Sequence, residues 1–532
     1  MIRKLFSQKF QSITGAALVI GGASLASRLI GVLRDRVLAS QFGAGETLDI
    51  YYAAFRIPDT LFQLLVAGAL SAAFIPLFIS LLEKNKEEAY QFATSVFVWV
   101  IFTVSLLSLF GIIFTPTLLG FIVPGFQGRL FYETVSVTRL MFFSPILLGI
   151  ASVFGSILQA EKRFFSVAIA PIFYNIGIIF GAFFFAPFLG VRGLAWGVIL
   201  GTFFYVFIEI PALLQSSFRF FSVKYFFHPE LPRMVRLMIP RILTLGISQI
   251  NFLVITNIGS LLGIGSLAVF HWAYNLQSFP LGIFAIPFSL AAFPIFSEYA
   301  SKNDVKGFVD QFSRIVRQIL FFLVPSTLLL ILLRAQIVRI ILGGGAFDWT
   351  ATVLTMNTLA YLSLGLGAQG LIYLLARGFH AWQETKIPFY ITLFSAFLHY
   401  FFAVYFAKNL GIEGLGLAFS LAQIIQCGLL WIFLRRKFHS LHEKTLCISL
   451  FKISLACIPL VVATQMGKMV FGGLFGTETF MKIFFQGFFS GIVGIIAFGV
   501  VGYFLRLPEL LALFLSLKKQ WFRFEGPIHI DE

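Results

Sequence analysis

The sequence predicts an all-α polytopic membrane protein with about fourteen transmembrane helices, arranged as two parallel six-helix repeats plus two extra C-terminal helices. Composition, recurring apolar runs and an internal duplication support this prediction. Of the 532 residues, 59% are hydrophobic and only 12% are charged, whereas about a quarter of the residues of a soluble domain are charged. A soluble fold of this length cannot bury so much apolar surface, so lipid is the predicted solvent.

Apolar runs of about 20 residues, the length that crosses a bilayer, recur between polar breaks along the chain. The predicted spans are 13–40, 47–80, 89–115, 131–160, 164–187, 193–215, 234–262, 266–296, 312–334, 351–377, 387–408, 414–434, 447–470 and 481–505. No connection between them is long enough for a separate soluble domain. No cleavable signal peptide precedes the first run, so we expect the first helix to be retained.

The basic residues predict the orientation of these helices. Lys and Arg occur in the N-terminal segment and in every second connection, whereas residues 41–45 and 262–266 contain none. Because basic loops stay in the cytoplasm, both termini are predicted to be cytoplasmic. The same rule explains the net charge of +16 without a nucleic-acid partner. The three cysteines lack metal or redox spacing, and we expect no metal or cofactor.

An internal duplication divides the chain. The motif GVRGL at residues 190–194 recurs as GIEGL at residues 411–415, which is 221 residues later. Further matches in the same order are Gly149 with Gly370, Ala160 with Ala381, and LSAAFIPLF at 70–78 with SLAAFPIF at 289–296. Repeats of six helices enter the membrane from the same side, as in transporters that rock two lobes about a central site. We therefore predict an N-lobe at 1–220, a C-lobe at 221–440, and a separate segment at 441–532.

Charged residues crowd the first two predicted helices. They are Arg28, Arg34, Asp35, Arg36, Asp49, Arg56 and Asp59. A charge that faces lipid near the bilayer centre costs about 2.5–3.5 kcal/mol, so these side chains should face water or a partner. Asp49, Tyr52, Arg56, Asp59 and Gln63 follow steps of three and four and should share one helix face.

The matching predicted helices of the second half, 234–262 and 266–296, carry polar stripes with fewer charged residues. Their members are Arg241, Thr244, Ser248, Asn251, His271, Asn275, Ser278 and Gly282. Four such stripes are predicted to line one central, net positive cavity. Arginine suits phosphate because its planar guanidinium donates two parallel hydrogen bonds. The alternative is that Arg28–Asp35 and Arg56–Asp59 are ion pairs that only join helices. His271 is expected to be a packing residue, and Glu209 is a candidate proton site.

Several segments resemble one family of transporters. Residues 26–45 (ASRLIGVLRDRVLASQFGAG), 48–61 (LDIYYAAFRIPDTL) and 68–78 (GALSAAFIPLF) are similar to the MurJ (MviN) lipid II flippases, and residues 275–298 and 376–388 resemble later motifs of that family. The resemblance implies a fourteen-helix member of the multidrug/oligosaccharidyl-lipid/polysaccharide (MOP) exporter superfamily. Such a protein moves undecaprenyl-pyrophosphate-linked peptidoglycan precursor to the outer leaflet of the bacterial inner membrane for cell-wall biosynthesis.

The resemblance also implies roles for individual residues. Arg28 and Arg34 would contact the pyrophosphate, with Asp35 and Asp49 as supporting acids, and the last two helices would form a groove for the lipid tail. Other family charges are missing, since Phe62, Gln63, Ala67 and Asn275 occupy those positions. Arg56 and Arg241 are candidates to compensate. Ser395 and His399 leave the eleventh helix without a carboxylate, so no sodium site is predicted there.

We therefore predict an alternating-access lipid II flippase that is not an enzyme. Its predicted substrate site comprises Arg28, Arg34, Asp35, Asp49, Arg56, Asp59, Arg241 and Asn275. Expected partners are the lipid-linked anion, membrane lipids and the cell-wall synthesis machinery, and membrane potential is the expected driving force. Four alternatives remain: an exporter of another polyprenyl-linked oligosaccharide, a drug/cation antiporter that uses Asp49 or Glu209, a membrane-embedded glycosyltransferase, and a non-transporting cell-wall scaffold.

Overall fold

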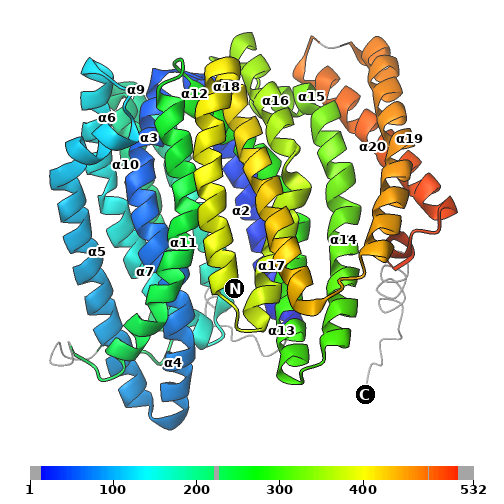
Figure 1. The fold of residues 1–532 in the computed structure, drawn as a ribbon. Coiled ribbons are helices and arrows are strands. Elements are labelled where there is room, and N and C mark those ends of the chain that lie inside the picture. The colour runs from blue at the N-terminus through cyan, green and yellow to red at the C-terminus, as the bar shows by residue number, and fades with distance from the viewer. Residues whose placement is uncertain (1–12, 221–226, 477, 513–532) are drawn as a thin grey trace, which may run out of the picture. The chain divides into compact units, whose positions relative to one another are not determined.

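The computed structural model describes residues 13–220, 227–476 and 478–512, which form long helices joined by short turns (Figure 1). Within these ranges the only extended pairing is an isolated bridge between Gly344 and Phe347. The predicted all-α class is confirmed. The predicted cytoplasmic termini fall on residues 1–12 and 513–532, outside the described part, so the orientation stays a prediction.

Helices cover each of the predicted spans. Those up to residue 260 are α2 (Ile13–Phe42), α3 (Glu46–Phe62), η1 (Gln63–Leu70), α4 (Ser71–Lys84), α5 (Lys86–Ile122), α6 (Gly128–Met141), α7 (Phe143–Ala160), α8 (Phe164–Phe180), η2 (Gly181–Phe185), α9 (Ala186–Leu189), α10 (Val191–Leu214) and α11 (Leu231–Ser260). Those that follow are α12 (Ser266–Pro280), η4 (Leu281–Ala285), α13 (Ile286–Ser301), α14 (Val305–Leu332), α15 (Arg334–Ile341), α16 (Trp349–Ser363), α17 (Leu366–Ala381), α18 (Lys386–Phe438), α19 (Glu443–Phe475) and α20 (Phe480–Phe504).

Many of these helices can cross a membrane. Ten in the described part are long and apolar enough, or up to eleven when the pair α16 and α17, bent by 45°, counts as one span. The charged helix α2 is not among the ten, and α18 counts as one although it contains two predicted spans. The polytopic class is confirmed, and the number fourteen stays a prediction.

The first compact unit comprises residues up to His271 together with residues 341–351. Its aromatic core joins α4 and α5, where the rings of Phe74 and Phe92 stack with centroids 5.6 Å apart. The helices α8 and α10 cross at glycines, and a Cβ added to Gly177 would clash with the backbone of Gly201. These small residues let the two backbones touch, as is common between membrane helices.

The second unit comprises residues 272–340 and 352–532. Its main core lies among α13, α14 and α17, where Phe296, Phe308 and Phe379 are fully buried. The helices α19 and α20 run side by side (Figure 1). They pack on α14 through a smaller cluster, in which the rings of Phe321 and Phe498 lie 5.5 Å apart.

Backbone details repeat between the two halves at the spacing seen in the sequence. Gly190, between α9 and α10, has φ 58° and ψ −139°. Gly411 has φ 60° and ψ −137° and divides α18 into two helical segments at a kink. This region of φ is strained for residues with a Cβ, which explains a glycine at both positions. Lys162 and Gln383 also share a positive φ at the same spacing. The duplicated motifs therefore carry duplicated backbone geometry.

The α8–α10 crossing gives a stability prediction. Gly177→Ala should lower the free energy of unfolding by about 1–3 kcal/mol, because the added methyl group forces apart two touching backbones. The comparison variant is Gly120→Ala on α5, where no atom lies within 4 Å of an added Cβ. Thermal unfolding of the purified proteins in detergent measures both. Equal melting temperatures for the two variants would contradict the observed close approach.

Candidate anion-binding site

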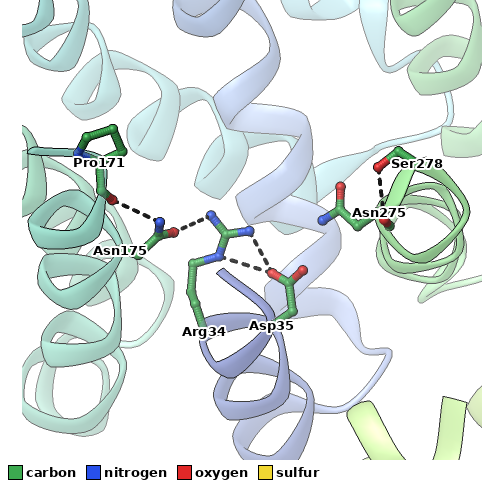
Figure 2. Close-up of polar contacts among 6 residues, drawn as sticks. All are labelled: Arg34, Asp35, Pro171, Asn175, Asn275 and Ser278. Atoms are coloured by element: carbon green, nitrogen blue, oxygen red, sulfur yellow. Dashed lines mark hydrogen bonds and ion pairs between the residues drawn. The ribbon is translucent and has the colours of Figure 1, made fainter. Parts of the chain in front are cut away.

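Arg34 lies at the centre of a polar cluster within the apolar helices of the first unit (Figure 2). Its Nη2 and Nε donate to Oδ1 of Asp35 over 2.7 and 3.0 Å. Its Nη1 donates to Oδ1 of Asn175 on α8 over 3.0 Å. Asn175 in turn donates from Nδ2 to the carbonyl oxygen of Pro171 over 2.9 Å. Because this last bond orients the amide, its oxygen is turned toward the guanidinium.

The ion pair of Arg34 and Asp35 is mostly shielded from solvent. The Asp35 side chain is 8% exposed and the Arg34 side chain is 20% exposed. Arg28 is exposed, Arg36 is half-buried, and Arg28 forms no ion pair with a described carboxylate. Three arginines and one aspartate therefore lie within three turns of α2. The alternative in which Arg28 pairs with Asp35 is wrong, because Asp35 pairs with Arg34.

Arg56 connects α3 to α11. Its Nε donates to Oγ1 of Thr256 over 3.2 Å, and its guanidinium carbon lies 5.1 Å from the ring centroid of Phe252. Asp59 accepts a long hydrogen bond of 3.5 Å from Nε2 of Gln63. Asp59 also interacts electrostatically with Arg56, so the alternative of an Arg56–Asp59 pair stays a prediction. Both charged side chains are half-buried.

Asp49 caps the N-terminus of α12. The residue is 3% exposed, and its carboxylate accepts from the backbone N–H groups of Gly265 and Ala268 over 2.6 and 3.1 Å. One turn along α3, the ring of Tyr52 stacks on His271 with centroids 4.1 Å apart. Asp49, Tyr52 and Arg56, three members of the predicted shared face, all contact α11 or α12. His271 makes the packing contact expected of it.

Arg241 and Asn275 complete the set of predicted site residues. Arg241 is exposed on α11, and the described residues offer it no ion pair. Asn275 is half-buried on α12 and belongs to the second unit. Its backbone carbonyl accepts from Oγ of Ser278 over 2.9 Å (Figure 2). The roles of all eight predicted residues in binding stay predictions.

Sequence reasoning missed two partners of the arginines, Asn175 and Thr256. Asn175 is a polar amide within the apolar run 164–180, and such a residue in a membrane helix is a signal of a buried contact. Thr256 carries no comparable signal, because a threonine in a membrane helix can bond its own backbone. It does so here, donating to the carbonyl oxygen of Phe252 over 2.9 Å.

The arrangement suits an anion better than a metal. Within the described ranges no group of three or more His, Cys, Asp or Glu side chains is placed to hold a metal ion. Arg34 of α2 instead supplies N–H donors, and Arg28 adds a positive charge. Such a site can bind a phosphate or pyrophosphate group.

The Asp49 cap gives a second stability prediction. Asp49→Ala should cost about 1–2 kcal/mol of unfolding free energy, because the N-terminal N–H groups of α12 lose their acceptor. Asp49→Asn should cost less, since its amide oxygen can still accept. Chemical or thermal unfolding measures the difference. The control is Asp304→Ala, which removes an exposed cap that accepts one bond from Gly307 and should cost less than Asp49→Ala.

Comparison with known proteins identifies the family. The family described as "Lipid II flippase MurJ" matches residues 38–486. The probable lipid II flippase MurJ of Thermotoga maritima is 29% identical over 484 residues, covering 91% of this chain and 95% of the relative. The lipid II flippase MurJ of Burkholderia cenocepacia is 27% identical over 437 residues, covering 79% of this chain and 84% of the relative.

Solved structures agree with this assignment. The structure described as "Lipid II flippase MurJ, inward closed conformation" superposes with a TM-score of 0.76 at 26% identity, covering 92% of this chain and 99% of that one. An inward-facing MATE family transporter of the MOP superfamily has a TM-score of 0.69 at 14% identity, with 80% and 99% coverage, and shares the fold. The chain is a member of the lipid II flippase MurJ family.

Proposed function

We propose that this chain is a lipid II flippase that moves the undecaprenyl-pyrophosphate-linked peptidoglycan precursor from the inner to the outer leaflet by alternating access. Family membership supports the substrate class, because the relatives are named as flippases. Relatedness to transporters in a multi-pass membrane fold supports transport rather than catalysis. The proposal rests mainly on the guanidinium of Arg34, which is partly exposed and is held in place by Asp35 and Asn175.

The hydrogen bonds of Arg34 support contact with the pyrophosphate. A guanidinium has five N–H donors, and three of those of Arg34 are used by Asp35 and Asn175. Two donors are left for a ligand, while the three bonds hold the plane of the group. Arg28 adds a second positive charge that no described carboxylate neutralises. Asp35 and Asn175 would then be positioning residues rather than direct ligands.

Membrane potential supplies a driving force for this reaction. In the proposed orientation both termini are cytoplasmic, and the headgroup moves from the negative interior to the exterior. Transfer of one negative charge in this direction is favourable by about 2.3 kcal/mol per 100 mV. We propose the ranges 1–220 and 221–440 as the lobes that rock, and 441–532 as the segment that supports the lipid tail. The cell-wall synthesis machinery is the proposed consumer of the product.

Binding by the purified protein tests the substrate class. Wild type should bind a lipid II analogue more tightly than a neutral glycolipid with the same tail. Arg34→Ala should weaken binding about 10- to 100-fold, because a hydrogen bond to a charged group contributes about 1.5–3 kcal/mol. Arg28→Ala should act in the same direction. Native mass spectrometry or calorimetry measures these affinities.

A matched arginine variant controls for a general loss of charge. Arg129→Ala removes an exposed arginine of the same unit that pairs with Glu133, and it should leave binding unchanged. If the neutral glycolipid binds as tightly as the lipid II analogue, the proposed substrate class is wrong.

Complementation separates a transporter from a scaffold. The wild-type gene should restore growth and shape to a bacterium depleted of its own lipid II flippase. Arg34→Ala should fail although the protein reaches the membrane in equal amount, because the headgroup site is lost. Full rescue by Arg28→Ala and Arg34→Ala together would favour the non-transporting scaffold.

A further inference from the structure

Glu209 is a carboxyl group buried inside the first unit, on α10. The residue is 0% exposed. Neither Oε1 nor Oε2 has a hydrogen-bond partner among the described residues. The other buried carboxylates described above, Asp35 and Asp49, both accept hydrogen bonds. A buried polar group without a partner in a native fold calls for an explanation.

The carboxyl group lies at a cavity of about 200 Å³. The lining residues come from α3, α7, α8 and α10, and they are Phe62, Leu148, Ala151, Ser152, Gly155, Gln159, Val167, Tyr205 and Glu209. Among these described residues, Tyr205 is the only titratable group besides Glu209, and no lining residue is cationic. The volume exceeds that of several water molecules, at about 30 Å³ each.

Gly155 on α7 leaves space for the Glu209 carboxyl group because it has no side chain. A Cβ added to Gly155 on α7 would lie 3.0 Å from Oε1 of Glu209 and 3.6 Å from Cγ1 of Val167. The carboxyl group therefore lies close to α7 at Gly155, where a side chain is missing. Any larger residue at position 155 would push against it.

The residues and the solvent around Glu209 determine whether its carboxyl group is ionised or protonated. An ionised carboxylate without hydrogen bonds or a counter-ion in an apolar interior is so costly that it takes up a proton instead. The cavity nevertheless has polar atoms on Ser152, Gln159 and Tyr205, which are all partly exposed. Gln159 is next to the end of α7, two residues before Glu161 and the turn at Lys162. Water that enters along this side would reach the carboxyl group.

We propose that Glu209 is a proton-binding site of the first unit. The carboxyl group carries a proton in the described conformation and releases it as H⁺ to water when the cavity becomes hydrated. Only the O–H bond breaks, and the carboxylate that remains is then stabilised by that water. The Glu209 carboxyl group would therefore be protonated when the cavity is dry and ionised when the cavity is hydrated. Coupling of this exchange to lipid transport rests on the proposed function, whereas proton binding does not.

Infrared spectroscopy of the purified wild-type protein tests the site without substrate. A protonated carboxyl group in a dry site has a C=O stretching band that shifts in D₂O. Glu209→Gln should remove this band, because the amide is neutral and of the same shape. Glu133→Gln, at an exposed ion pair of α6, should retain it. An unchanged band in Glu209→Gln would overturn the proposal.

A second variant keeps the test valid if Glu209→Gln is unstable. Gly155→Ala retains the carboxyl group but places a methyl group against Oε1, so the same band should shift in frequency. A band unaffected by Gly155→Ala would contradict its assignment to Glu209. Replacement of the wild-type band by carboxylate bands on addition of Na⁺ at constant pH would show a sodium site and would also overturn the proposal.

A transport assay tests the coupling separately. In liposomes without a membrane potential, a pH gradient should change the rate of lipid II analogue transfer by wild type severalfold. The rate of Glu209→Gln should not respond to the gradient. Absence of transfer by wild type would count against the proposed function, while the infrared band would still decide whether Glu209 binds a proton. A retained response in Glu209→Gln would rule out coupling through this residue.

Discussion

The contact between Arg34, Asp35 and Asn175 connects the charged helix α2 to the apolar helix α8 of the first unit. A guanidinium cannot lie in lipid without a large cost, so α2 must turn it toward α8, where an amide oxygen accepts from it. Asp35 supplies a counter-charge from the adjacent position. This contact favours one rotation of α2 against α8, and it leaves the guanidinium oriented and partly exposed.

Other charged groups of the same unit also need partners within the apolar bundle, and they find them in different ways. Asp49 satisfies its carboxylate with backbone N–H groups at the start of α12. Arg56 uses a threonine and an aromatic ring on α11. Among the described residues Glu209 has no such partner, and the proposed proton would neutralise its charge. Groups with full sets of partners stabilise the bundle, whereas those with spare donors or no partner are available for ligands.

In the proposed transport cycle, the groups that are available for ligands bind the headgroup and the proton. Three bonds hold the Arg34 guanidinium in one plane, so little side-chain entropy is lost when a pyrophosphate binds. Membrane potential acts on the charge of the headgroup, and the protonation of Glu209 adds a second, pH-dependent input in the same unit. The paired glycines Gly190 and Gly411 show that both halves use the same sharp turn before an equivalent helix. The same backbone geometry at both glycines is consistent with an internal duplication of the sequence.

The sequence by itself determined the helical membrane class, the positions of the helices, the duplication, and the set of charged residues that needs an explanation. Length, hydropathy and spacing carry this information, because a bilayer requires about 20 apolar residues per span and expels unpaired charge. Only the tertiary structure decided which partner each charge has. Arg34 forms an ion pair with Asp35 and a hydrogen bond with Asn175. Arg56 donates a hydrogen bond to Thr256, and Asp49 caps α12. These choices depend on which helix faces meet, and residues such as Asn175 are 141 positions away from their partner in the chain.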